Sequence, residues 1–435
     1  MNLFINKIIS LKKSFYFKNL ITLTIGASFA QLIGILVAPI LSRLYSPEDY
    51  GIFAIFASVV TILSTIFSLR YESKILIPKD ENEVTTLLLL ILYTTFILGG
   101  LFFFLSFFPS VLFYQSIGIF KLGFWLRFTI LAAICTTLIN SFYYYLTKKS
   151  LFKLITYSRI FTSAFSSFFA VILGYFFVKG GLIISQIISL LVGVIFVFFL
   201  SKFNFTKDNN NKNNIFAIAK KHKNAPIYLL PASLIDVFSY QLQIFLIALW
   251  FKMSDVGNLR MAWTILALPA SFIGSAIGQL FFQKFTDIMP DLKNAKIYLF
   301  QTWRNLFFIG IIPSILVILF GKELFVIFLG QKWENSGEIA SILAPMFFIT
   351  FISSPTSSTY IALGIEKIGF YLNIFVLIAR PLSLYIGMIN NNLKLGLHIF
   401  VLLEFANILI YQFFALYYIK IIIFKNFEEK KKIEF

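Results

Sequence analysis

The chain has 435 residues, of which 59% are hydrophobic and only 13% are charged. So few polar residues cannot cover a soluble globule of this length, which excludes a soluble protein and indicates a polytopic membrane protein. The net charge of +18 would suggest a nucleic-acid partner in a soluble protein. We expect no such partner, because Lys and Arg accumulate in the cytoplasmic loops of membrane proteins.

The N-terminal region predicts a surface helix followed by two membrane spans. Residues 1–18 alternate apolar residues with four lysines, which is typical of an amphipathic helix on the cytoplasmic membrane surface. The apolar run Leu20–Leu41 lacks a small-residue cleavage pattern, so we expect a retained span rather than a signal peptide. A polar loop around Pro47 separates it from the second run, Ile52–Leu69, because proline cannot continue a helix.

Ten further apolar runs are long enough to cross about 30 Å of hydrocarbon. They predict an all-α integral membrane protein with twelve transmembrane helices in two pseudo-symmetric six-helix lobes. The runs are Val84–Phe107, Gly123–Leu146, Leu154–Phe177 and Leu182–Leu200 in the first half, and Pro226–Trp250, Gly257–Leu280, Thr302–Leu329, Ile339–Leu363, Lys367–Met388 and Lys394–Ile419 in the second.

A polar, asparagine-rich stretch divides the two halves. The expected organisation is an N-lobe at 19–200, a cytoplasmic linker at 201–224, a C-lobe at 225–420 and a cytoplasmic tail at 421–435. With the N-terminus placed inside, most lysines and arginines fall in cytoplasmic segments, so both termini are expected in the cytoplasm.

A short internal sequence repeat supports duplication of the lobes. Asp49-Tyr50-Gly51 follows the first span, and Asp255-Val256-Gly257 follows the seventh. Because each half holds an even number of spans, both would enter from the same side, as parallel repeats do.

Five charged residues fall inside spans or near their ends: Arg127, Arg159, Asp236, Arg380 and Glu404. A charge at bilayer depth costs about 2.5 to 3.5 kcal/mol on insertion scales, so such residues are candidates for a transport pathway. Arg159 and Arg380 each lie more than one helical turn from either end of their spans. Arg127 lies near the outer end of its span, where it could instead extend its guanidinium to the lipid headgroups.

Helical spacing gives several of these charges polar neighbours on one face. Four polar stripes cannot all face lipid, so we expect them to line a water-filled cavity between the halves. The candidates are Arg159 with Ser163 and Ser166, Asp236 with Tyr240 and Gln243, Arg380 with Asn373, Glu404 with Asn407 and Tyr411, and Gln31 on the first span. Helix packing is the alternative for the serines, and a structural ion pair with an arginine is the alternative for Asp236.

The chemistry of these residues fits a phosphorylated, sugar-bearing ligand. Guanidinium groups bind diphosphate oxygens in bidentate fashion, and amide and hydroxyl groups bind sugar hydroxyls. Asp236 and Glu404 could exchange protons or bind Na⁺ during a transport cycle.

The tenth expected span contains a polar run, Ser353–Thr359, around Pro355. Proline removes a backbone hydrogen bond, and the freed groups need other partners at membrane depth. The run predicts a hinge or a broken helix, with an ordinary proline kink as the alternative.

The sequence lacks the motifs of several kinds of enzyme and metal site. Gly321-Lys322 is followed by Glu323 without a preceding phosphate-binding loop, so we expect no ATP hydrolysis. Cys135 is the only cysteine, and the two histidines, His222 and His398, have no metal-binding spacing. We expect no enzyme, no metal and no cofactor beyond a coupling ion, H⁺ or Na⁺.

The first two spans and the connection after them carry a family resemblance. The segments Ser42–Ala54, Leu69–Glu72 and Leu76–Lys79 resemble the start of bacterial polysaccharide-biosynthesis flippases; the later chain is similar only in its pattern of spans. The matching positions are Arg43, Tyr45, Pro47, Glu48, Gly51, Arg70 and Glu72.

This resemblance implies the fold of the multidrug, oligosaccharidyl-lipid and polysaccharide exporter superfamily and a place in the bacterial inner membrane. It implies a flippase that moves undecaprenyl-diphosphate-linked oligosaccharides to the periplasmic leaflet by alternating access, for lipopolysaccharide O-antigen, capsule or exopolysaccharide synthesis. The diphosphate would meet Arg159 and Arg380, and a polysaccharide polymerase is an expected partner. One departure is that the first span carries no basic residue, only Thr24, Ser28 and Gln31.

Two other functions remain open. A drug or cation antiporter of the same superfamily would share the twelve spans but should use a cavity dominated by acids, whereas arginines outnumber acids among the charges named above. A membrane polysaccharide polymerase would be expected to carry a large periplasmic domain or loop, whereas the longest connection here, 201–224, is expected to be cytoplasmic.

Overall fold

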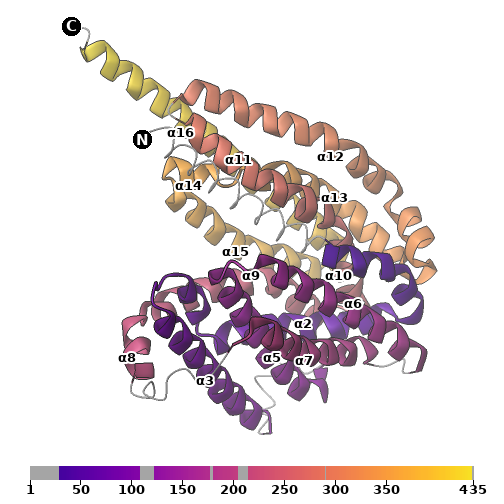
Figure 1. Ribbon diagram of the computed structural model, residues 1–435. Coiled ribbons are helices and arrows are strands. Elements are labelled where there is room, and N and C mark those ends of the chain that lie inside the picture. The colour runs from indigo at the N-terminus through magenta and orange to yellow at the C-terminus, as the bar shows by residue number, and fades with distance from the viewer. Residues whose placement is uncertain (1–28, 108–121, 177–179, 204–213, 290, 434–435) are drawn as a thin grey trace. The chain divides into compact units, whose positions relative to one another are not determined.

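The computed structural model of the protein describes residues 29–107, 122–176, 180–203, 214–289 and 291–433, and within these ranges all regular secondary structure is helical (Figure 1). The chain divides into two compact units, residues 1–257 and 258–435. The expected amphipathic segment 1–18 and the beginning of the first expected span lie outside the described residues.

Ten helices of the described chain are long and apolar enough to cross a membrane, and each corresponds to one of the twelve expected spans. The other two expected spans correspond to the shorter helix Phe29–Leu44 and to an interrupted pair of helices, α10 and α11. The expected all-α, multi-span architecture is confirmed.

The described part of the first unit contains one helix before α2 and seven labelled helices. They are Phe29–Leu44, α2 (Pro47–Phe67), α3 (Glu81–Leu105), α5 (Trp125–Lys148), α6 (Phe152–Phe176), α7 (Gly181–Ser201), α8 (Asn214–Lys221) and α9 (Leu230–Trp250), with a π-helical turn at Ala225–Leu229 before α9. Helix α5 packs against α2, α3 and α7, and α6 packs along α7. Helices α5, α6 and α7 are therefore mutual neighbours.

The loop between the first two helices caps α2 from both directions. The Ser46 hydroxyl accepts a hydrogen bond from the backbone N–H of Asp49, and the Asp49 carboxylate accepts one from the backbone N–H of Ser46. Pro47 occupies the first helical turn, where its missing N–H costs nothing. The turn expected around Pro47 is therefore present, and reciprocal capping fixes the start of α2.

A second pair of charges from the segments that carry the resemblance, Arg70 and Glu72, closes the turn after α2. Arg70 has a left-handed φ of 60° at the start of the 3₁₀ helix Tyr71–Leu76, and its Nη1 donates to Glu72 Oε1 at 3.0 Å. The Glu72 side chain is only 5% exposed, whereas the Arg70 side chain is 31% exposed. A carboxylate buried this deeply needs its cation.

We therefore expect Arg70→Ala to lower the free energy of unfolding by about 2 kcal/mol, because it leaves the Glu72 carboxylate buried without a cation. Thermal unfolding of the purified protein in detergent measures this change. The double variant Arg70→Ala/Glu72→Gln removes the stranded charge and should recover part of the loss. If Arg70→Ala melts at the wild-type temperature, the pair does not stabilise the turn.

The expected linker contains structure at its C-terminal end. Helix α8 packs against α3. At the end of α8, Lys221 Nζ donates to Glu83 Oε2 at 2.8 Å, and Nε2 of the next residue, His222, lies 2.8 Å from Glu83 Oε1. These contacts fasten the end of the 201–224 segment to the first turn of α3.

The two repeated tripeptides, Asp49-Tyr50-Gly51 and Asp255-Val256-Gly257, contact each other within the first unit. A Cβ added at Gly51 would lie 2.2 Å from the carbonyl O of Met253, and one added at Gly257 would lie 1.8 Å from the carbonyl O of Pro47. Only glycine permits backbones to come this close. The glycines at the start of α2 and in the first turns of α10 (Met253–Leu266) thus form one backbone contact.

The second unit continues from α10 through six further helices. They are α11 (Ser275–Ile288), α12 (Leu292–Leu329), α13 (Glu334–Ser353), α14 (Thr359–Leu363), α15 (Glu366–Ile389) and α16 (Leu393–Ile433), with short turns at Ala270–Gly274, Gln331–Trp333 and Ser354–Thr356. Helix α12 packs along α13, α15 packs along α16, and α13 packs against α16. Helices α12 and α16 extend beyond their expected spans, because charged residues outside the hydrocarbon can continue a helix.

Two helices of the second unit are interrupted. The expected single span Gly257–Leu280 is instead α10 and α11, joined through a π-helical turn at Ala270–Gly274. Pro269 directly precedes this turn and cannot donate a helical hydrogen bond. The break expected at Ser353–Thr359 is confirmed: α13 ends at Ser353, a 3₁₀ turn covers Ser354–Thr356, and α14 begins at Thr359.

Candidate functional site

A polar cavity of about 430 Å³ lies within the first unit. Its walls come from the helix Phe29–Leu44 and from α2, α5, α6 and α7. Most of its polar groups are hydroxyls and amides, and none of the described residues that line it is acidic or basic. The polar lining residues are Tyr50, Thr136, Asn140, Thr162, Ser163, Ser166, Ser167, Ser185, Gln186 and Ser189.

Two predicted binding serines take part in this cavity. Ser163 Oγ donates to the carbonyl O of Ala30 at 2.5 Å, and Ser166 Oγ donates to Gln186 Oε1 at 3.2 Å. On the α7 side, Ser189 Oγ donates to the carbonyl O of Thr162 at 2.7 Å. These bonds join α6 to both neighbouring helices, so the serines hold helices together and line the cavity as well.

Arg159 begins the same face of α6 but does not line the cavity. Its guanidinium lies over the Tyr143 ring, with Cζ 5.3 Å from the ring centroid. The Tyr143 hydroxyl is hydrogen-bonded to Ser158 Oγ at 3.1 Å, which fixes the ring beside the arginine. Arg159 therefore stands at one end of the polar stripe, held by an aromatic face.

The buried Tyr45 supports the opposite end of the cavity. Its side chain is fully buried, and its hydroxyl donates to the carbonyl O of the cavity residue Ala170 at 2.8 Å. Burial, and to a lesser degree the nearby Asp49 carboxylate, raises the pKa of Tyr45 to about 12. The phenol therefore stays protonated at neutral pH and keeps donating this bond.

The predicted polar face of α9 divides between exposed and buried groups. Asp236 and Tyr240 are exposed, whereas Gln243 is 5% exposed and its Nε2 is buried without a hydrogen-bond partner. Asp236 forms no ion pair within the described part of the chain. A neighbouring residue, Gln241, accepts a hydrogen bond from Ser58 of α2 at 2.8 Å, which ties α9 to that helix.

In the second unit, two predicted residues meet directly. Arg380 of α15 donates through Nε to Glu404 Oε1 of α16. The Arg380 side chain is 14% exposed and the Glu404 side chain is 9% exposed. The residues assigned separate roles in the sequence, phosphate binding and ion coupling, are therefore partners in one buried ion pair.

The two interrupted helices of the second unit face each other across a cavity of about 490 Å³. Gly274 and Gly278 line it from one side, and Ser354, Pro355 and Ser358 line it from the other. Ser358 Oγ is buried without a hydrogen-bond partner, as is Oγ1 of the adjacent Thr359. Hydroxyls left without partners can bind water or the hydroxyls of a ligand.

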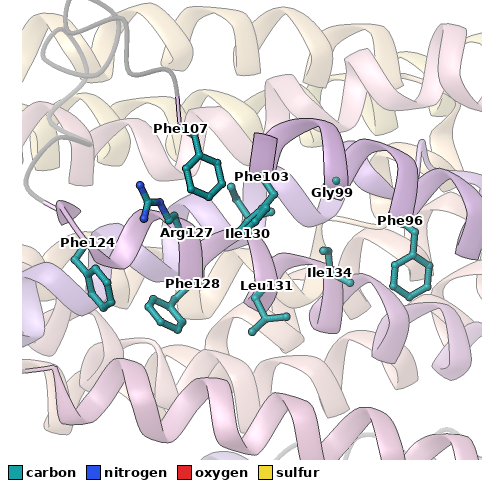
Figure 2. Close-up of a pocket in the computed structure, with 11 residues that line it drawn as sticks. Phe96, Gly99, Phe103, Phe107, Phe124, Arg127, Phe128, Ile130, Leu131 and Ile134 are labelled. Atoms are coloured by element: carbon teal, nitrogen blue, oxygen red, sulfur yellow. The ribbon is translucent and has the colours of Figure 1, made fainter. Parts of the chain in front are cut away.

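The remaining predicted residues lie elsewhere. Gln31 is exposed on the helix Phe29–Leu44. The side chain of Asn373 is outside the described part of the structure. Arg127 lines a different, mostly aromatic pocket at the first turn of α5 (Figure 2).

Sequence reasoning missed the contributions of α5 and α7 to the first cavity. Thr136 and Asn140 are four residues apart on α5, and Ser185 and Ser189 are four apart on α7, flanking Gln186. Each set places polar groups on one helical face inside an apolar span. That spacing was visible in the sequence, but none of these residues carries a charge that would draw attention to it.

Solved structures with the same fold are membrane transporters. A multidrug resistance transporter of the MATE family in an inward-facing conformation is 14% identical over 92% of this chain and 94% of that chain, with a TM-score of 0.69. Lipid II flippase MurJ in an inward closed conformation is 16% identical over 91% and 87%, with a TM-score of 0.70. A MOP superfamily transporter from Pyrococcus furiosus is 14% identical over 93% and 96%, with a TM-score of 0.55.

At these identities the likeness shows the fold alone. The chain is a multi-pass membrane protein with the twelve-helix, two-lobe fold of the MOP superfamily. Residues 40–338, more than half of the chain, match the family described as polysaccharide biosynthesis protein, and the chain belongs to that family. A comparison with curated proteins found no match.

Proposed function

We propose that the protein is a flippase for lipid-linked oligosaccharides. It would move repeat units on undecaprenyl diphosphate from the cytoplasmic to the periplasmic leaflet of the inner membrane by alternating access. Its product would serve O-antigen, capsule or exopolysaccharide synthesis, with a polysaccharide polymerase as the next partner. Membership in a polysaccharide biosynthesis family, in a chain with a transporter fold, carries this proposal.

The neutral lining of the first-unit cavity supports a saccharide substrate. Sugars are recognised through hydroxyl groups, which Asn140, Ser163, Ser166 and Gln186 can bind as donors or acceptors. A drug or cation antiporter would need carboxylates instead, and the lining residues that the structure describes include none. The same cavity, although roomy, offers no counter-charge for a cationic ligand.

The charged part of the substrate would use the arginines. Guanidinium groups bind phosphate oxygens through paired hydrogen bonds. In this proposal, Arg159 and Arg380 bind the diphosphate during the cycle, and the Lys/Arg distribution keeps both termini in the cytoplasm. Asp236 and Glu404 would couple transport to H⁺ or Na⁺, with Glu404 doing so by releasing Arg380.

Loss of the gene in the producing cells tests this function. We expect lipid-linked repeat units to accumulate with their sugars facing the cytoplasm, and the surface polysaccharide to disappear. Wild-type protein should reverse both effects, whereas Arg159→Ala and Arg380→Ala should do so poorly. Normal surface polysaccharide combined with new sensitivity to cationic drugs would favour an antiporter instead.

Filling the first-unit cavity gives a sharper expected result. A Cβ added at Gly34 meets no atom within 4 Å, so Gly34→Leu can extend into the cavity without displacing the fold. We expect a fall of at least about tenfold in transport rate, equivalent to about 1.4 kcal/mol in the barrier. The smaller Gly34→Ala should have a weaker effect, and neither should lower the melting temperature. A wild-type rate for folded Gly34→Leu would place the pathway elsewhere.

A further inference from the structure

A second cavity of the first unit, of about 600 Å³, has a different chemical character. It lies between the last turns of α3 and the first turns of α5 (Figure 2). Aromatic rings from both helices form its walls, and a single arginine, Arg127, is its charged group. Its volume is in the range of pockets that hold small ligands.

The walls of this pocket are exposed rather than packed. Phe96 and Phe103 of α3 are 58% and 44% exposed, and Phe124, just before α5, is 69% exposed. In a membrane-spanning helix, exposed rings of this kind meet lipid chains, not water. The pocket therefore presents an apolar surface that acyl chains can cover.

Two consecutive glycines of α3 line this pocket and have different surroundings. A Cβ at Gly99 would lie 2.6 Å from Ile134 Cδ1, so Gly99 permits close packing against α5. A Cβ at Gly100 would meet no atom within 4 Å, so no packing contact requires glycine there. Glycine within a helix is less favourable than alanine. At Gly100 the less favourable residue is therefore present without a packing reason, and it leaves open space in the pocket.

Arg127 gives the pocket its one polar end. Its guanidinium Cζ lies 4.3 Å from the centroid of the Phe107 ring, and Figure 2 shows the two side chains at the same end of the pocket. A cation–π contact leaves the edge of the guanidinium, with its N–H donors, available for an anion. Arg127 forms no ion pair with any residue that the structure describes.

We propose that this pocket binds an anionic phospholipid of the bilayer, with its phosphate on Arg127 and an acyl chain among the phenylalanines. Guanidinium binds phosphate through two parallel hydrogen bonds, which an uncharged donor does not match. Among the described lining residues, Arg127 is the only polar side chain, which favours a phosphate with apolar chains over a sugar headgroup as the occupant. The site is separate from the polar cavity and does not depend on the proposed transport function.

Native mass spectrometry of the delipidated protein, titrated with phosphatidylglycerol or phosphatidylcholine, tests the site. We expect wild-type protein to bind one phosphatidylglycerol preferentially. Arg127→Gln should weaken that binding at least about tenfold, since a hydrogen bond to a charged group is lost. Phosphatidylcholine should lose less, because its choline cation already balances its phosphate. Gly100→Leu should weaken the binding of both lipids, because its side chain occupies the pocket.

Lys252→Gln is the matched control. It removes one positive charge at an exposed position that is expected on the same side of the membrane, outside the pocket. It should retain the phosphatidylglycerol preference. The proposal fails if Arg127→Gln binds like wild type, or if Lys252→Gln loses as much affinity. It also fails if undecaprenyl diphosphate displaces phosphatidylglycerol from wild type but not from Arg127→Gln, because the pocket would then hold the polyprenyl lipid.

Discussion

Gly257→Ala is expected to destabilise the first unit strongly. The added Cβ would lie 1.8 Å from the carbonyl O and 2.8 Å from the carbonyl C of Pro47, and 2.9 Å from the backbone N of Gly51. All three are backbone atoms of the capped start of α2, which cannot rotate away as a side chain could. We expect a loss of about 3 kcal/mol of stability from this overpacking.

Thermal unfolding and size-exclusion profiles in detergent measure that loss. Gly100→Ala is the matched control, because it adds the same methyl group to a helical glycine with open space around its Cβ. It should be neutral or slightly stabilising, since alanine favours the helix. If Gly257→Ala melts with the control, the backbone contact between Gly51 and Gly257 does not stabilise the first unit.

The second large effect concerns the buried ion pair of α15 and α16. Glu404→Ala leaves the Arg380 guanidinium in a site where its side chain is 14% exposed, without the carboxylate that balances it. Removing one partner of a buried pair costs about 3 to 5 kcal/mol. We expect a corresponding fall in melting temperature and the loss of transport.

The double variant Arg380→Leu/Glu404→Leu separates stability from function. Apolar residues of similar size often replace a buried ion pair without loss of stability, so the double variant should melt near the wild-type temperature. It should still fail to transport if the pair binds diphosphate or couples an ion. A folded double variant with wild-type transport would show that Arg380 and Glu404 serve structure alone.

The sequence predicted features whose causes are local. The turn at Pro47 follows from proline, two acids and a capping serine within a few residues, and the helix break at Ser353–Thr359 follows from Pro355 in a polar run. Both appear in the structure. Apolar length alone was enough to predict the spans, because hydrocarbon thickness sets it.

Features that depend on distant residues were not predictable in the same way. Arg380 and Glu404 are on separate helices, and no spacing rule pairs them, so their ion pair appears only in the folded chain. The sequence showed the repeat that contains Gly51 and Gly257, but it did not predict their backbone contact.

The eighth expected span shows a different limit. The apolar run Gly257–Leu280 does form helices, but the π-helical turn at Ala270–Gly274 that interrupts them was not predicted. Pro269 gave a local signal. A proline can be accommodated by a kink or by a break, and the surrounding packing decides between them.

Flipping by the purified protein is the most direct test of the proposed function. In proteoliposomes, a labelled undecaprenyl-diphosphate oligosaccharide in the inner leaflet becomes accessible to an impermeant reagent only after it crosses. Wild-type protein should speed that access well above empty liposomes, and Gly34→Leu should return it close to their rate. Access at the rate of empty liposomes with wild-type protein, together with transport of a cationic dye down an ion gradient, would contradict the account.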